Sequence, residues 1–233
     1  MASRPARSTP PPPPPHDGAG SVLLRARPAG PRGRRTLERI LEATVELAAE
    51  VGFEAVNTNL VAARAGVNIA SLYKYFPNKQ AIFVTIAERM AVTFQAEVTA
   101  LVGQIDAGRP WREAMAEGVR LAARRRLDAP GERAIRMALR LSPEIQGLDA
   151  EATLANAAIL ADLIARRSGA PPGRAGIVGR VAIEMAAAIL DLLLTASAPD
   201  EAEALVREAV EAFLRYLEPW MEPSRGGVPI AAA

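Results

Sequence analysis

Residues 57–80 read NTNLVAARAGVNIASLYKYFPNKQ, a pattern typical of two short helices joined by a tight turn. Asn57 can cap the first helix, because its side-chain oxygen can accept a hydrogen bond from an otherwise unpaired amide of the first turn. Gly66 can end that helix, since a left-handed residue costs least without a β-carbon. Asn68 can cap the second helix, and Pro77 prevents it from continuing. The stretch therefore predicts a helix-turn-helix.

The second of these helices, residues 69–76, has two different faces. Leu72 and Phe76 lie one turn apart and can form an apolar seam with the first helix. Ser71 and Lys74 lie on the other side. The residues that flank them are Ile69, Ala70, Tyr73 and Tyr75. A helix in a DNA major groove uses such a face, because hydroxyl and amine groups reach base edges and a small residue permits close approach.

Three segments closely resemble the DNA-binding domain of the tetracycline-repressor (TetR) family of transcription regulators. They are Gly52-Phe53, Ala65-Gly66-Val67 and residues 71–79, SLYKYFPNK. The resemblance covers roughly residues 34–82, and a long, ordered match of this kind is specific. The chain departs from the family pattern at three positions. Asn68 stands where Ser or Thr is usual, Ala70 where Gly is common, and Leu60 where a polar residue is usual.

The resemblance and the two-faced helix together predict a set of DNA-binding residues. These are Thr58, Asn59, Asn68, Ile69, Ala70, Ser71, Tyr73, Lys74, Tyr75 and Lys79. Within this set, Ser71 and Lys74 are predicted to read bases. The predicted phosphate contacts are Thr58, Asn59, Tyr73, Tyr75 and Lys79.

The composition predicts an all-α protein, because hydrophobic residues make up 50% of the chain, aromatic residues only 4%, and no alternating strand pattern is evident. Further helices are expected over residues 36–51, 78–101, 111–126, 132–140, 149–167, 173–196 and 200–221. The predicted domains are a disordered Pro- and Arg-rich arm (1–33), a three-helix DNA-binding domain with the helix-turn-helix (34–80), a helical ligand-binding and dimerisation bundle (81–222) and a disordered tail (223–233).

Catalytic and metal-binding residues are scarce. The chain has no cysteine, its single histidine, His16, lies in the Pro-rich arm, and it has no phosphate-binding glycine loop. Glu184 and Asp191 are separated by about 10 Å of helix rise, too far to share a proton, and are expected to form a polar edge with Arg180. The sequence therefore predicts no catalytic site, no metal site, no cofactor and no enzyme activity.

The charge is unevenly distributed along the chain. Residues 1–80 carry 11 basic and 6 acidic side chains, whereas residues 81–233 carry 17 and 20. Attraction to phosphate requires a positive surface near the helix-turn-helix, which this split provides. The most apolar later stretch, residues 177–196, is interrupted by three charges, and the first residues do not have the form of a signal peptide. We therefore expect a cytoplasmic protein with no membrane partner.

Two arginine clusters each allow two interpretations. The arm carries Arg25, Arg27, Arg32, Arg34 and Arg35, which fit either a DNA backbone or minor-groove contact or a solubilising tail. Residues 124–126 are three consecutive arginines that span much of a helix circumference. A solvated helix end is favoured for them over a carboxylate-binding site.

The last two helices have broad apolar faces that suit either a subunit interface or a monomer core. The TetR resemblance implies that they form a four-helix bundle in a homodimer. A cavity among the middle helices is a second candidate feature. Its predicted lining is Phe94, Trp111, Met115, Met137, Leu160 and Met185, although residues at this spacing are more often plain core.

Together these features predict a ligand-responsive, DNA-binding transcriptional regulator. The favoured form is a repressor that a small apolar or aromatic effector releases from a palindromic double-stranded operator. The alternative is a helical ligand-binding or scaffolding protein with no sequence-specific DNA binding. A steep loss of affinity with added salt, seen only with duplex DNA, separates the two.

Overall fold

The computed structural model describes residues 25–222 except for residues 27, 29, 129 and 142–145. Most of the predicted arm, the predicted tail from residue 223 and the predicted helix stop at Ser142-Pro143 lie outside the described residues. The described residues form helices and no strand, so the all-α prediction is confirmed. No described helix combines the length and hydrophobicity that crossing a membrane requires.

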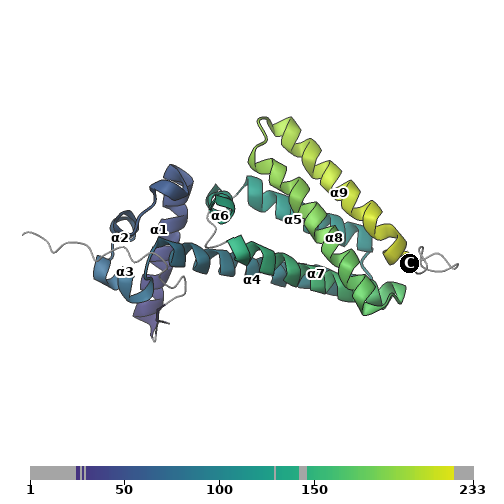
Figure 1. Cartoon of the computed structure of the whole chain (residues 1–233), viewed down its shortest axis with the longest axis horizontal. Helices are drawn as coiled ribbons and strands as arrows, with labels where there is room; N and C mark the ends of the chain where they lie inside the picture. Colours follow the sequence, from purple (N-terminus) through teal and green to yellow (C-terminus); the bar gives the residue numbers. More distant parts are fainter. Residues whose placement is uncertain (1–24, 27, 29, 129, 142–145, 223–233) are drawn as a thin grey trace, which may run out of the picture.

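The chain forms a small helical unit at one end and a longer helical bundle at the other (Figure 1). The first unit contains α1 (Pro31–Ala55), α2 (Thr58–Arg64) and α3 (Ile69–Tyr75). The long helix α4 (Lys79–Asp106) extends from this unit into the bundle. The bundle continues with α5 (Trp111–Leu127), α6 (Pro130–Leu141), α7 (Gln146–Ser168), α8 (Pro172–Asp191), the short 3-10 helix η1 (Leu192–Leu194) and α9 (Pro199–Met221).

The first helix begins earlier than predicted, at Pro31 instead of residue 36. Proline is favoured at this position because its missing N–H would be unpaired there and its φ already fits a helix. Helix α1 thus includes residues 31–33, which the sequence analysis assigned to the arm. Gly52, at φ 77°, interrupts α1 near its end and allows Phe53 to turn back onto the domain.

The unit formed by α1, α2 and α3, called the N-terminal unit below, has its own hydrophobic core. Phe53 of α1 meets Phe83 of α4 edge-on, with ring centres 4.8 Å apart. Helix α6 also contributes to this core, because Ile135 and Ala138 are fully buried in it. Two residues of α6, which belongs to the larger bundle, thus complete the hydrophobic core of the N-terminal unit.

The larger bundle packs α4, α5, α7, α8 and α9 around a second core. Helices α7 and α8 approach so closely that a β-carbon on Gly179 would lie 2.7 Å from the carbonyl oxygen of Ala157. Helix α8 ends at Asp191, earlier than the predicted residue 196, and Leu192–Leu194 tighten into a 3-10 turn. Helix α7 ends before Gly169, which adopts φ 70° as a helix-stopping glycine should.

Candidate DNA-binding surface and ligand cavity

Asparagine side chains cap the three helices around the turn. The Oδ1 atom of Asn57 accepts hydrogen bonds from the amides of Asn59 and Leu60, at 3.1 and 3.0 Å. Asn68 accepts from the amide of Ala70 at 2.8 Å, and Asn78 accepts from that of Ala81 at 2.8 Å. These caps fix where α2, α3 and α4 begin, because each satisfies an amide that the helix itself leaves unpaired.

The turn between α2 and α3 is held by backbone geometry and one arginine. Gly66 adopts φ 58°, a conformation that most residues avoid. Arg39 of α1 donates a hydrogen bond to the carbonyl oxygen of Gly66 at 3.1 Å. A β-carbon at Gly66 would lie 2.6 Å from the same guanidinium. Glycine is therefore favoured by the backbone angle, whereas the flexible Arg39 side chain could move to make room for a β-carbon.

The inner face of α3 is fully buried. Leu72 and Phe76 have no exposed surface, and they pack with Val61 of α2. The predicted seam is confirmed, and it orients α3 so that its opposite face points away from the core. On that opposite side Ala70 and Lys74 are exposed, and Ile69, Ser71 and Tyr73 are half-buried.

One hydrogen bond joins two predicted phosphate contacts. The hydroxyl oxygens of Thr58, at the start of α2, and Tyr73, in α3, are 3.0 Å apart. Asn59 is exposed beside Thr58. The structure therefore brings the start of α2 and the outer face of α3 onto one surface.

The structure shows contacts within the chain for two predicted phosphate contacts, Tyr75 and Lys79. Tyr75 is only 6% exposed and its ring belongs to the core, because the first helix and the chain before it cover it. Its carbonyl oxygen accepts a hydrogen bond from the amide of Arg25 at 2.8 Å. The Lys79 ammonium donates to the carbonyl oxygens of Phe53 and Glu54, both at 3.2 Å, and lies 4.5 Å from the Phe53 ring centre. Lys79 thus donates hydrogen bonds to two backbone carbonyl oxygens at the end of α1.

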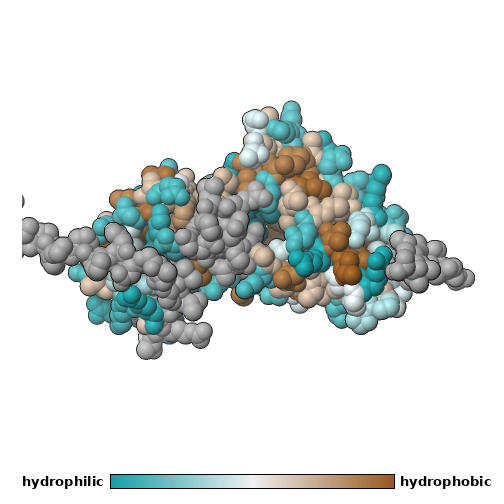
Figure 2. Space-filling view, viewed as in Figure 1, coloured by the Kyte–Doolittle hydropathy of each residue, from teal (hydrophilic) through white to brown (hydrophobic). Residues whose placement is uncertain are grey.

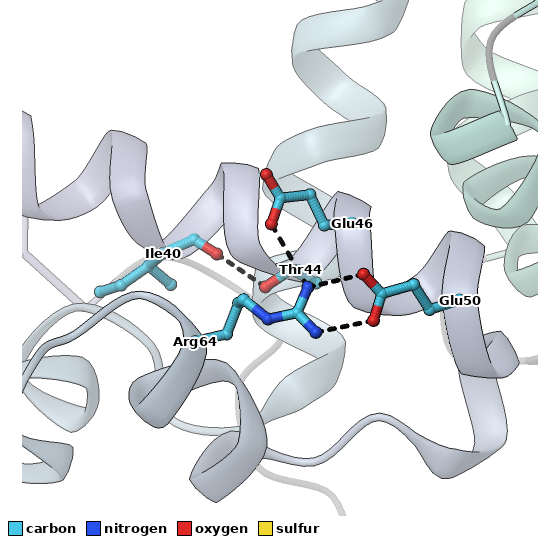
Figure 3. Close-up of polar contacts among 5 residues, drawn as sticks. All are labelled: Ile40, Thr44, Glu46, Glu50 and Arg64. Carbon is cyan, nitrogen blue, oxygen red and sulfur yellow. Dashed lines mark hydrogen bonds and ion pairs between the residues drawn. The ribbon is translucent and has the colours of Figure 1, made fainter.

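Glutamates on α1 form ion pairs with other helices. Arg64 of α2 donates two hydrogen bonds to Glu50, at 2.8 and 2.6 Å, and one to Glu46 at 3.4 Å (Figure 3). On the same helix Glu38 binds Arg89 of α4 at 2.6 Å. The hydrogen bonds from Arg64 hold the pKa of the Glu50 carboxyl below its ordinary value, and they raise the pKa of the arginine. The charge of Arg64 is therefore compensated by glutamates of the same chain.

A cavity of about 490 Å³ lies inside the larger bundle. Its walls come from α4, α5, α7 and α8, with single residues of α6 and α9. This volume is typical of small-molecule sites. Of the six residues predicted to line a cavity, Phe94, Met115 and Leu160 do so.

The other three predicted lining residues do not reach the cavity. Trp111 is buried in the core and donates a hydrogen bond from its ring nitrogen to Glu222 at 2.8 Å. Met137 is exposed on α6, and Met185 is half-buried on α8. Sequence spacing identified apolar faces, but which face meets the cavity depends on how the helices are rotated against each other.

Polar residues that the sequence pattern did not single out also line the cavity. Arg126 is buried and binds Asp191, with nitrogen to oxygen distances of 3.0 and 3.2 Å. Asn156 of α7 is buried in the same wall. A signal for Asn156 exists in the sequence, since this polar residue precedes Leu160 and Ile164 on one apolar helix stripe.

The favoured interpretation of residues 124–126 as a solvated helix end is wrong for two of the three arginines. Arg126 pairs with Asp191. The sequence analysis expected Asp191, together with Glu184, to pair with Arg180 instead. Arg125 binds Glu97 of α4 at 2.7 Å and Glu132 of α6 at 3.4 Å, and only Arg124 is exposed. The Arg125 guanidinium lies 5.5 Å from the centre of the Phe94 ring.

Comparisons with known proteins agree with this architecture. Residues 40–86 match the family model described as bacterial regulatory proteins of the tetR family, and residues 110–217 match a tetracyclin repressor-like C-terminal domain. A crystal structure of a TetR-family transcriptional regulator from Streptomyces coelicolor is 30% identical, with a TM-score of 0.61, over 80% of this chain and 97% of that one. The chain belongs to the TetR family.

Two other similar proteins give weaker evidence about function, because one match is short and the other has low sequence identity. The HTH-type transcriptional repressor KstR of Mycolicibacterium smegmatis is 38% identical over 69 residues, which are 30% of this chain and 34% of that repressor. The chain therefore matches only about a third of this curated TetR relative. The multidrug binding protein EbrR, crystallised with malachite green, has a TM-score of 0.60 at 19% identity over 77% of this chain and 96% of that one. That likeness shows the TetR fold alone.

Proposed function

We propose that this TetR-family protein is a repressor that binds a palindromic DNA operator as a homodimer and releases it when a small apolar molecule occupies the cavity. The observation that carries the proposal is the orientation of α3. Its buried face, its Asn68 cap and the Gly66 turn hold it so that Ala70, Ser71 and Lys74 are on the outside. A short helix with a small, polar outer face fits the major groove.

The dimer would form through α8 and α9. Three large apolar side chains are exposed along the outer side of α8: Ile177 is 59% exposed, Val181 43%, and Leu192, just after the helix, 51%. Figure 2 shows hydrophobic side chains gathered over this part of the surface. Large apolar side chains exposed on one side of a helix favour a partner that covers them, such as a second copy of the chain. A symmetric dimer would present two α3 helices to half-sites about 34–36 Å apart.

The cavity is a suitable effector site because α6 connects it with the N-terminal unit. Ile135 and Ala138 of α6 are buried in the N-terminal core, whereas Arg136 of the same helix lines the cavity. Arg125 also binds Glu132 of α6 and stacks on Phe94 at the cavity wall. An effector that favours a different position of α6 would therefore shift the population of dimers whose α3 helices match the operator.

DNA binding can be tested by fluorescence anisotropy with duplex DNA from the region upstream of the protein's own gene. We expect the double variant Ser71→Ala/Lys74→Ala to bind at least tenfold more weakly, since each specific base contact contributes about 1–3 kcal/mol. The matched control is Thr99→Ala/Arg120→Ala, which removes one hydroxyl and one positive charge at exposed positions of α4 and α5. Equal binding by wild type and the Ser71/Lys74 variant would exclude these side chains from base reading.

The alternative, a ligand-binding or scaffolding protein without sequence-specific DNA binding, predicts a different result. It requires that affinity for duplex DNA be weak and independent of sequence. The family comparison does not favour it. Measuring anisotropy over a range of salt concentrations, with the upstream duplex and a scrambled duplex, separates the two possibilities.

A further inference from the structure

The cavity wall is apolar apart from a few polar side chains, and its two cations already have interaction partners. Apolar lining residues include Met90, Phe94, Leu101, Met115 and Leu160. The buried cation Arg126 is already bound to Asp191, and Arg136 also has an interaction partner. Two further charged residues, Glu88 and Glu151, are exposed and acidic. An anionic ligand would have to compete with Asp191 for its cation and would be repelled by the glutamates, so a neutral ligand is favoured.

Asn156 is a buried polar residue of the cavity wall whose amide makes only part of its possible hydrogen bonds. The residue is only 7% exposed and lines the cavity from α7. Its Nδ2 atom donates to the carbonyl oxygen of Ala152 at 3.0 Å, which fixes the orientation of the amide. Its Oδ1 atom is shielded from solvent and accepts no hydrogen bond.

A buried carbonyl oxygen without a donor destabilises the ligand-free protein. Leucine has nearly the same shape as asparagine and would remove this cost, so packing alone does not account for asparagine here. An unsatisfied buried polar atom in a cavity wall is a candidate contact for a bound molecule. A hydroxyl or N–H group brought by a ligand would satisfy the oxygen.

We infer that the cavity selects a neutral, mainly apolar molecule that carries a hydroxyl or N–H donor, and that Asn156 recognises this donor. The inference rests on the proposed function for the role of the cavity, and it specifies the chemical class of the effector. Because Oδ1 is an acceptor only, an ether or a bare hydrocarbon of the same size would leave it unsatisfied.

Three probes of nearly equal size test the inference by isothermal titration calorimetry at pH 7: 2-naphthol, 2-methylnaphthalene and 2-naphthoate. Wild type is expected to bind 2-naphthol roughly two- to tenfold more tightly than 2-methylnaphthalene, the range of one net hydrogen bond. It should bind 2-naphthoate most weakly. Asn156→Leu should lose the preference for 2-naphthol, and its ligand-free melting temperature should equal or exceed that of wild type.

Leu160→Ala is the matched control, because it removes apolar wall and should weaken 2-naphthol and 2-methylnaphthalene binding in parallel. Tightest binding of 2-methylnaphthalene or 2-naphthoate by wild type overturns the inference, as does no binding of any probe. A preference for 2-naphthol that persists in Asn156→Leu also overturns it. If that variant does not fold, the order of the three affinities in wild type still tests the inference. Operator binding is measured without any probe, so failure of the proposed function is recognised separately.

Discussion

Arg64 lies at the end of α2, close to the proposed DNA-binding surface, but its charge pairs with glutamates of α1. Its guanidinium binds Glu50 through two parallel hydrogen bonds and reaches Glu46 as well. Bidentate pairs of this kind have a fixed geometry, so the arginine ties the end of α2 to α1. The pair is solvent-exposed, and its contribution to stability is accordingly small.

The Glu50 carboxyl should make stability depend on pH in one direction. Its pKa in the folded protein lies below the ordinary value of 4.5, because Arg64 donates hydrogen bonds to the ionised form. The stabilisation is therefore fully present above pH 4.5 and is lost as the pH falls through the folded pKa. Urea unfolding should show Glu50→Gln less stable than wild type at pH 7, with the difference shrinking as the solution is acidified toward pH 3.

Glu42→Gln, an exposed change about two turns earlier on α1, is the control for this experiment. A difference between Glu50→Gln and wild type that grew with acidification would contradict the assigned direction.

Residue roles could be predicted from the sequence where the cause is local. The caps at Asn57 and Asn68 and the turn at Gly66 were predicted correctly, because a cap or a left-handed turn involves only neighbouring residues. The burial of Tyr75 was not predicted because its environment includes residues before α1, which are distant in sequence. The contacts of Lys79 and of the arginines at 125 and 126 were not predicted for the same reason, since their partners lie on other helices.

At the scale of elements, α6 is the helix whose role was least evident from the sequence. Its amphipathic pattern predicted a short helix, but the pattern does not say that one side enters the core of the N-terminal unit while another meets the cavity. The start of α6 packs tightly on α1: a β-carbon on Gly131 would lie 2.1 Å from the Cγ1 atom of Val45. A valine in a helix has one strongly preferred rotamer, so it cannot easily move aside.

Gly131→Ala should therefore push α6 away from α1. We expect a loss of about 1–3 kcal/mol in the free energy of unfolding, the usual cost of overpacking, measured by urea denaturation. The double variant Val45→Ala/Gly131→Ala should recover most of that loss, because it removes the methyl group that clashes. Purely additive effects of the two changes would show that the two positions do not interact.

At the scale of the whole molecule, the exposed apolar row on α8 bears on assembly. Charged side chains at the centre of a subunit interface carry a desolvation cost that apolar contacts do not offset. Ile177→Glu/Val181→Glu should therefore sediment as a monomer in analytical ultracentrifugation at concentrations where wild type is a dimer. Its affinity for the upstream duplex should also fall, because each subunit would then bind one half-site alone.

Val51→Glu places the same charge at an exposed apolar position of α1, outside the α8 and α9 surface, and should leave the sedimentation of the dimer unchanged. If the α8 variant remained dimeric, the interface would have to lie elsewhere on the molecule.

Helix α4 connects the two ends of the molecule, so a tilt of this helix moves both of them. It runs for 28 residues, roughly 42 Å, from the core of the N-terminal unit past the cavity wall (Figure 1). Unlike α1, it contains no residue with non-helical angles. A stiff rod of this kind acts as a lever: a tilt of about 5° displaces a point roughly 30 Å away by about 2.5 Å. Small-amplitude rocking at the ligand site would thus be enlarged at the DNA.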